Sequence, residues 1–305
     1  MHKSVLLEEC LQYLNLKEDS IVVDCTLGYG GHSSEILKKI PKGFLYAFDQ
    51  DQEAIDYSKN RLHAVASNYE IIKSNFVHLN EELQKRNIKE VDGILFDLGV
   101  SSPQLDEDYR GFSFHKDAPL DMRMDRDNPF SAYDVVNTYS CADLIRIMQE
   151  YGEEKYASRI ASAIVKIREQ KPIETTLELV EIIKDNVPEK YKREKHPARK
   201  VFQAIRIEVN HELEVFESAL EQALTQIKIG GRICVITFHS LEDRICKTKF
   251  KEVSQIDPVL GKLPIIPEEY LPNYKCIATK EANIQELEEN NRARSAKLRV
   301  IERIK

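Results

Sequence analysis

Between residues 21 and 97, short apolar runs alternate with amphipathic stretches, and this rhythm restricts the fold more than any other feature of the chain. The run at 21–25 is rich in β-branched residues and too short for a helix, so it predicts a buried strand. Strands that alternate with helices predict βαβ crossovers and an α/β fold with a doubly wound parallel sheet. The other predicted strands lie at 44–48, 69–72 and 91–97, and the predicted helices lie at 32–40 and 54–65.

The alternation stops after residue 97 and strand patterns return only late in the chain. Residues 99–131 form a polar segment, and loops of such length are usually functional. Only helical patterns follow over 142–186, and strand patterns return at 231–237 and 298–304 after a long predicted helix at about 199–227. We therefore predict one discontinuous α/β domain, residues 1–107 and 200–305, with an all-helical domain inserted at 108–199.

Charge and cysteine usage narrow the class of protein. The chain carries a formal net charge of −7, yet the stretches 190–200 and 291–305 each hold six basic residues and one acid. Local patches of this kind, rather than the total charge, govern binding to a polyanion.

The six cysteines are too dispersed for a disulfide framework or a zinc site, and no apolar run is long enough to cross a bilayer. We expect a cytoplasmic protein without a metal centre or a membrane partner.

A glycine-rich turn after the first predicted strand indicates a ligand at the carboxyl edge of the sheet. Gly28, Gly30 and Gly31 let the backbone pass close beneath a ligand. Asp49 ends the second strand, where an acid holds a ribose in nucleotide-binding α/β folds. The glycine spacing disfavours a nicotinamide oxidoreductase. Asp24 would repel a pyrophosphate but suits an ammonium or a sulfonium, and S-adenosylmethionine has both. The alternative is a tight turn that binds nothing.

The residues after the fourth predicted strand are candidates for the chemistry. Asp97 ends that strand beside the same crevice, and the hydroxyls of Ser101 and Ser102 follow it. An aromatic amine is a poor nucleophile because its lone pair is delocalised into the ring. A hydrogen-bond acceptor on the N–H localises that pair and later takes the proton, and we predict this role for Asp97. The alternative role for Asp97 is the capping of a turn.

Eight sequence strings, found in the same order, resemble the bacterial 16S rRNA cytosine-N4 methyltransferase family, RsmH (MraW). They are DCTLGYGGHS (24–33), DLGVSSPQLD (97–106), RGFSF (110–114), PLDMRMD (119–125), HPA (196–198), FQAIR (202–206), FHSLEDR (238–244) and RARS (292–295). The resemblance implies a Rossmann-like S-adenosylmethionine-dependent sheet and methylation of the exocyclic N4 of a cytidine in the decoding region of small-subunit rRNA. The cofactor contacts that it implies fall on Gly30, Gly31, His32, Asp49, Phe76, Asp97 and Gln104.

Several parts of the sequence are predicted to contact RNA. The segment 110–125 mixes aromatics, acids and arginines that suit an extruded base and its phosphate, and the basic stretch 190–200 suits further phosphates. The alternatives are an acid–base network that pins a loop and ordinary solvated charge. The candidates are Arg110, Phe112, Phe114, Asp117, Asp121, Arg123, Lys192, Arg193, His196, Arg199, His239, Arg292 and Arg294.

Two other classes of function stay open from the residues. A non-catalytic RNA-binding or ribosome-assembly factor on a methyltransferase fold fits the same basic stretches. A DNA amino-methyltransferase fits the same chemistry, but that group usually carries an Asp/Asn-Pro-Pro-aromatic string, and Asp97-Leu98-Gly99-Val100 stands in its place. A homodimer is also compatible with the sequence.

Overall fold

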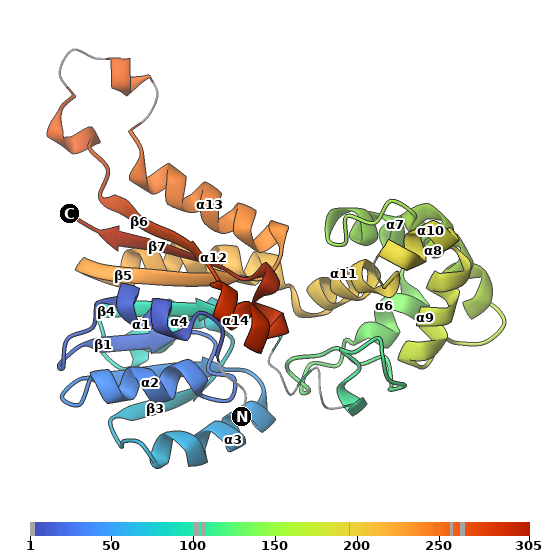
Figure 1. Cartoon of the computed structure of the whole chain (residues 1–305), viewed down its shortest axis with the longest axis horizontal. Coiled ribbons are helices and arrows are strands. Elements are labelled where there is room, and N and C mark those ends of the chain that lie inside the picture. Colours follow the sequence, from blue (N-terminus) through green and yellow to red (C-terminus); the bar gives the residue numbers. More distant parts are fainter. Residues whose placement is uncertain (1–3, 101–103, 105–107, 195, 257–258, 263–265) are drawn as a thin grey trace. The chain divides into compact units, whose positions relative to one another are not determined.

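The computed structural model describes residues 4–100, 104, 108–194, 196–256, 259–262 and 266–305 (Figure 1). They form two compact units: unit 1 comprises Met1–Gly99 and Leu213–Lys305, and unit 2 comprises Val100–Glu212. The predicted domain boundaries lay instead at 107/108 and 199/200. The second boundary differs because the helix at 198–210, which the sequence analysis assigned to the α/β domain, contributes its apolar side chains to the core of unit 2.

The described residues of unit 1 form a seven-stranded sheet in the order β3-β2-β1-β4-β5-β7-β6. Its neighbours are parallel from β3 to β5, whereas β7 is antiparallel to both β5 and β6. The predicted α/β fold with a doubly wound sheet is confirmed, with an antiparallel edge that the sequence analysis did not predict. The strands are β1 (Ile21–Asp24), β2 (Phe44–Asp49), β3 (Tyr69–Lys73), β4 (Val91–Asp97), β5 (Ile227–Thr237), β6 (Tyr274–Glu281) and β7 (Lys297–Arg303).

Alternate residues of the central strands point to opposite faces of this sheet, and each face has its own core. Val22 and Leu95 belong to one core, while the adjacent Val23 and Phe96 belong to the other. Side chains of α1, α2 and α3 complete the first core, and those of α4, α12 and α13 complete the second. The helices of unit 1 are α1 (Leu7–Leu14), α2 (Gly31–Lys39), α3 (Gln52–His63), α4 (Leu79–Lys85), α12 (Glu212–Gln226), α13 (Ser240–Ser254) and α14 (Ile284–Glu289), with short 3-10 turns at Phe76–His78 (η1), Leu260–Lys262, Glu268–Tyr270 and Asn291–Ser295.

The described part of unit 2 contains helices and no strand of the sheet. The predicted helical patterns over 142–186 are confirmed, and their apolar residues, such as Leu144, Ile160 and Val180, are buried in one core. Ile167, an apolar residue of the same stretch, is instead 40% exposed. The helices are α6 (Ala132–Thr138), α7 (Cys141–Glu150), α8 (Ala157–Arg168), α9 (Thr176–Asp185), α10 (Glu189–Glu194) and α11 (Ala198–Asn210), with a 3-10 turn at Asp108–Arg110.

The single long helix predicted at about 199–227 is wrong. The structure has two helices, α11 and α12, separated at His211, whose φ of 51° is left-handed. One residue in this conformation ends a helix because its backbone turns away from the helical path. Histidine gives no sequence signal for such a break, whereas a glycine at this position would have done so.

Candidate functional site

Four neighbouring strands of unit 1 end at the same edge of the sheet, and each is followed by predicted cofactor residues. Because β3, β2, β1 and β4 are parallel neighbours, their carboxyl ends lie side by side. Ligands of open α/β sheets bind at this edge. Phe76, Asp49, the glycine turn and Asp97 follow β3, β2, β1 and β4 in that order. The topology therefore groups the predicted residues of unit 1 at one edge.

Asp24 ends β1 and accepts hydrogen bonds from residues on both sides of the glycine turn. Its side chain is buried, and its Oδ2 accepts a hydrogen bond of 2.6 Å from the Ser33 hydroxyl. Its Oδ1 accepts the backbone N–H of Thr26 at 3.0 Å. Burial raises the pKa of the Asp24 carboxyl, and the bond from Ser33 opposes this rise. These contacts give Asp24 a structural role in the turn, and its contact with a cofactor stays a prediction.

The glycine turn leads directly into α2. Gly30 is the N-cap residue of this helix with a left-handed φ of 71°, a conformation that costs glycine little. The first N–H groups of a helix have no partner within it, and those of Gly31 and His32 are among them here. Gly30, as the N-cap residue, has no side chain that could cap this end of α2. The helix start therefore offers backbone donors that suit a carboxylate.

Asp49 ends β2 and reaches back to the glycine turn. Its Oδ2 accepts the N–H of Gly28 at 2.8 Å, and its Oδ1 accepts the N–H of Asp51 at 2.9 Å. The side chain is nonetheless partly exposed. Burial raises the pKa of the Asp49 carboxyl to about 7, with smaller contributions from the charges of Asp51 and Asp24. Each oxygen keeps a lone pair beyond its backbone bond, so the carboxylate has room for the hydroxyls of a ribose.

Phe76 begins the 3-10 turn η1 after β3 and is partly buried. Its ring meets Phe96 edge to face, with centroids 5.7 Å apart and planes at 85°. This packing fixes the ring against the core and leaves part of it exposed. An aromatic surface held in this way suits the flat face of a nucleobase.

Asp97 ends β4 and is connected to the turn after β1. Its backbone N–H donates to the Thr26 hydroxyl at 2.7 Å. Its Oδ2 lies 3.4 Å from His32 Nδ1, whereas Oδ1 is buried without a hydrogen-bond partner among the described residues. A buried carboxylate oxygen without a partner is costly, which is why such atoms often mark functional sites. Sequence analysis predicted Asp97 but not the imidazole of His32 or the hydroxyl of Thr26, because only the folded backbone brings them together.

Three predicted site residues cannot be placed at this edge. Ser101 and Ser102, predicted to face the methyl acceptor, lie outside the described residues. Gln104 is described and buried, but it belongs to unit 2. Their predicted roles therefore stay predictions.

Part of the predicted RNA surface in the segment 110–125 is buried or paired. Arg110 is 2% exposed and Phe112 is 5% exposed, so neither presents its side chain to solvent. Arg123 forms a bidentate ion pair with Asp121, with both N–O distances at 2.8 Å. Asp117 accepts the N–H of Leu177 at 3.3 Å, at the start of α9. These contacts favour the alternative of a network that pins the loop.

Other predicted RNA residues of unit 2 are more accessible. Phe114 stacks on His196 with centroids 4.5 Å apart and planes at 21°, and both rings are partly exposed. Burial lowers the pKa of His196. Arg193 and Arg199 are exposed, and Lys192 pairs with Glu189 at 2.6 Å. The structure therefore brings together Phe114 and His196, which come from opposite ends of residues 110–200. The exposed cations Arg193 and Arg199 lie close to His196 in the sequence.

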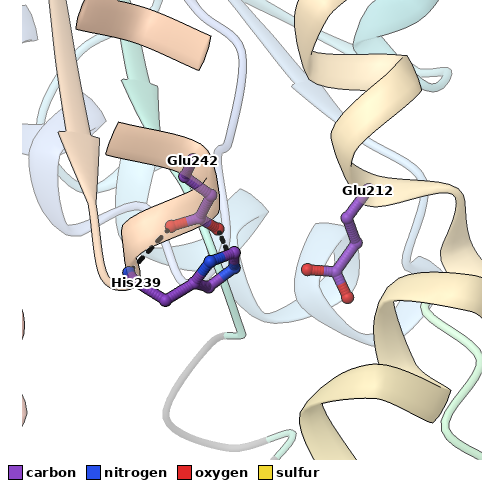
Figure 2. Close-up of side chains that lie close together, drawn as sticks. All are labelled: Glu212, His239 and Glu242. Carbon is purple, nitrogen blue, oxygen red and sulfur yellow. Dashed lines mark hydrogen bonds and ion pairs between the residues drawn. The ribbon is translucent and has the colours of Figure 1, made fainter. Parts of the chain in front are cut away.

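The remaining candidates belong to unit 1. Figure 2 shows that His239 and Glu242 point toward each other at the start of α13, with Nε2 and Oε1 3.1 Å apart. Glu242 Oε2 also accepts the N–H of Phe238 at 2.8 Å, which holds His239 in place. Glu212, also drawn, belongs to unit 2, where it pairs with Arg206 at 2.7 Å. Arg294 is exposed and Arg292 is partly buried. Among the described helices, none is long and apolar enough to cross a membrane.

Comparison with known proteins decides the family. The model of the MraW methylase family matches residues 1–304. The ribosomal RNA small subunit methyltransferase H of Exiguobacterium sibiricum is 55% identical over 307 residues, which cover 100% of this chain and 98% of that protein. The chain belongs to the MraW methylase family. This membership confirms the predicted family, and with it S-adenosylmethionine as the cofactor that a methylase of this kind uses.

Solved structures give weaker likenesses to this MraW chain. An rRNA methylase from Streptococcus thermophilus has a TM-score of 0.45 and 12% identity, with 100% of this chain and 99% of that chain covered. TrmN from Thermus thermophilus has a TM-score of 0.43 and 13% identity, with 98% of this chain and 48% of that chain covered.

Proposed function

We propose that this chain transfers a methyl group from S-adenosylmethionine to the exocyclic N4 amine of a cytidine in the decoding region of 16S rRNA. The observation that carries the proposal is Asp97, whose Oδ1 is buried at the carboxyl edge of the sheet of a methylase and has no partner among the described residues. A carboxylate oxygen that can accept from an N–H is what an amino-methylating enzyme needs at this place.

The residues around the glycine turn suit the parts of the cofactor. Asp49 would accept from the ribose hydroxyls, and Phe76 would lie against the adenine. The backbone N–H groups of Gly31 and His32 at the start of α2 would donate to the carboxylate of the cofactor. When bound, S-adenosylmethionine supplies a methyl group on a positively charged sulfur.

The proposed reaction depends mainly on the side chain of Asp97. Asp97 Oδ1 would accept the N4–H of the cytosine, which returns the nitrogen lone pair from the ring to the amine. Proximity and orientation then supply most of the rate, since no covalent intermediate with the chain is required. Asp97 would take the proton that N4 loses after it is methylated.

The experiment that tests the function measures methyl transfer from labelled cofactor to 16S rRNA and to small ribosomal subunits, followed by nucleoside analysis. The expected product is N4-methylcytidine within the decoding region. Label on another base or on carbon 5 of cytosine would contradict the proposal. Calorimetric binding of S-adenosylmethionine without transfer to either substrate would favour an assembly factor instead.

We propose that cations of the stretch 190–200 contact RNA phosphates. Replacing Lys192, Arg193 and Arg199 by Gln is expected to weaken binding to 16S rRNA, because each lost phosphate contact also lowers the release of counterions. The slope of log K against log salt should become less negative by about 0.7 for each contact with single-stranded RNA, or about 2 for all three. Binding isotherms at several salt concentrations measure this slope.

The control for that experiment removes three exposed lysines of unit 1, Lys39, Lys42 and Lys59. It lowers the net charge of the protein by the same amount. An equal change of slope in both variants would show that only the total charge matters, and would exclude a specific patch.

A further inference from the structure

The imidazole of His32 lies between two acceptors. His32 is the second residue of α2, and its side chain is 5% exposed. Its Nδ1 lies 3.4 Å from Asp97 Oδ2, and its Nε2 lies 3.1 Å from the carbonyl oxygen of Val5. Both ring nitrogens therefore have a defined partner in unit 1.

The carbonyl partner of His32 is itself fixed by a carboxylate. The N–H of Leu6 belongs to the same peptide group as the carbonyl of Val5, and it donates to Glu286 Oε1 at 2.7 Å. Leu6 is fully buried, and Glu286 is 7% exposed. A negative charge on the N–H side of a peptide polarises it, so the Val5 oxygen becomes a stronger acceptor.

These contacts determine the protons of the ring. A carbonyl oxygen can only accept, so Nε2 carries a hydrogen. An ionised carboxylate can also only accept, so Nδ1 carries a second hydrogen when it faces Asp97. The contact with Asp97 raises the pKa of His32, although burial opposes the rise. The two acceptors therefore favour the imidazolium form of His32, with Nδ1 facing Asp97.

We propose that His32 is a positioning residue, whose Nδ1–H holds Asp97 Oδ2 so that Oδ1 is left to accept from the amine of the substrate. The inference rests on the proposed function. It assigns a role to the imidazole, which is distinct from the backbone N–H of His32 that would contact the cofactor. Because the carboxylate cannot rotate without losing its ion pair, its remaining oxygen keeps one direction.

The proposed methyl transfer needs only the cofactor, the N4 amine of the cytosine and Asp97. The bond from sulfur to the methyl carbon breaks, and its electron pair returns to sulfur. The N4 lone pair forms the new bond to that carbon, and N4 then loses one proton to Asp97 Oδ1. The imidazolium keeps both of its protons throughout, and Asp97 releases the proton that it accepted to solvent after the product leaves.

Two substitutions of His32 distinguish the roles of its two ring nitrogens. In His32→Gln the amide nitrogen can replace Nε2 and bond Val5, but nothing replaces Nδ1. In His32→Asn the amide nitrogen can replace Nδ1 and bond Asp97, but the bond to Val5 is lost. We expect His32→Gln to lower kcat for methyl transfer by about 100-fold, and His32→Asn to lower it by less than about tenfold. Calorimetry should show nearly unchanged affinity for S-adenosylmethionine, because both variants keep the backbone N–H.

The pH profile of kcat distinguishes a positioning role of His32 from a purely structural one. The charged groups that face the imidazole are Asp97 from β4 and Asp24 from β1, with Glu286 of α14 beyond the peptide. Because the contact with Asp97 raises the pKa of His32, the wild-type kcat should fall only at high pH, where the imidazolium loses its proton. The amide of His32→Gln does not titrate, so this basic limb should be absent from the profile of the variant.

Several outcomes would overturn the inference. One is a His32→Gln variant with wild-type kcat, and another is an equal loss of kcat in both variants. A third is a loss of kcat in His32→Gln with lowered thermal stability and an unchanged basic limb, which would indicate a structural role. The wild-type protein is assayed beside the variants. If it transfers no methyl to N4, the proposed function fails together with this inference. Wild-type transfer with an unaffected His32→Gln variant overturns the inference alone.

Discussion

Replacing Asp97 by Asn is expected to lower the rate of methyl transfer by about 10²- to 10⁴-fold while the protein stays folded. The substitution keeps the size of the side chain but removes its negative charge. If the amide oxygen takes the place of Oδ2 opposite His32 Nδ1, the amide NH2 group points toward the substrate. That group is a donor, so it cannot accept from the amine or take its proton. Single-turnover transfer from labelled S-adenosylmethionine at saturating cofactor measures the rate.

The control for Asp97→Asn is the same substitution at Asp56, an acid of α3 that is 63% exposed and pairs only with Lys59 at 3.6 Å among the ion pairs of the described residues. This control is expected to keep wild-type transfer. Thermal unfolding of both variants should show that each is folded at the assay temperature. Wild-type turnover by Asp97→Asn would exclude this carboxylate as the proton acceptor.

Much of the α/β fold could be predicted because its strands differ from its helices in period. The runs at 21–25 and 91–97 carry consecutive apolar residues, as expected of strands that are covered on both faces. Strand β6 was missed because its residues are mostly exposed and include Lys275 and Lys280, which leaves no apolar pattern. Edge strands commonly carry such charges. The direction of β7 was also missed, since apolar periodicity does not encode whether a strand pairs parallel or antiparallel.

The candidate site was predicted in its positions but not in its contacts. Asp49 and Asp97 end strands, and sheet topology alone places strand ends at one edge. The structural role of Asp24 and the imidazole of His32 depend on hydrogen bonds to Ser33 and Val5, and no periodicity reports such bonds. A sequence shows which residue types are present. Whether an arginine pins a loop or is available to RNA depends on the groups that it contacts, and only the structure shows them.

The affinity for S-adenosylmethionine is expected to fall as the pH falls below 7, because Asp49 must be ionised to accept from the ribose hydroxyls. The pKa of Asp49 is raised to about 7 by burial, so the carboxyl is protonated over a range in which an ordinary Asp is charged. A protonated carboxyl loses acceptor capacity. If binding requires the charged form, the dissociation constant rises about tenfold for each pH unit below 7, or about 100-fold at pH 5. Calorimetry between pH 5 and 8 measures this dependence.

The raised pKa of Asp49 also makes the stability of the folded protein depend on pH. A folded-state pKa above the unfolded value means that the folded protein binds more protons between the ordinary pKa of Asp and about pH 7. The contribution of Asp49 to stability therefore falls as the pH rises through this window. Bound cofactor would recover part of that loss by stabilising the carboxylate. The thermal shift on adding S-adenosylmethionine should consequently be larger at pH 8 than at pH 6.

The variant Asp49→Asn separates this carboxyl from Asp24 and His32, whose pKa values are also raised. Asn cannot accept from both Gly28 and Asp51, so the variant should bind S-adenosylmethionine more weakly at every pH. It should also lose the steep dependence below pH 7, because the amide does not titrate. Asp24 and His32 are unchanged in this variant. A pH dependence as steep as that of the wild type would therefore assign the titration to a group other than Asp49 and contradict its role.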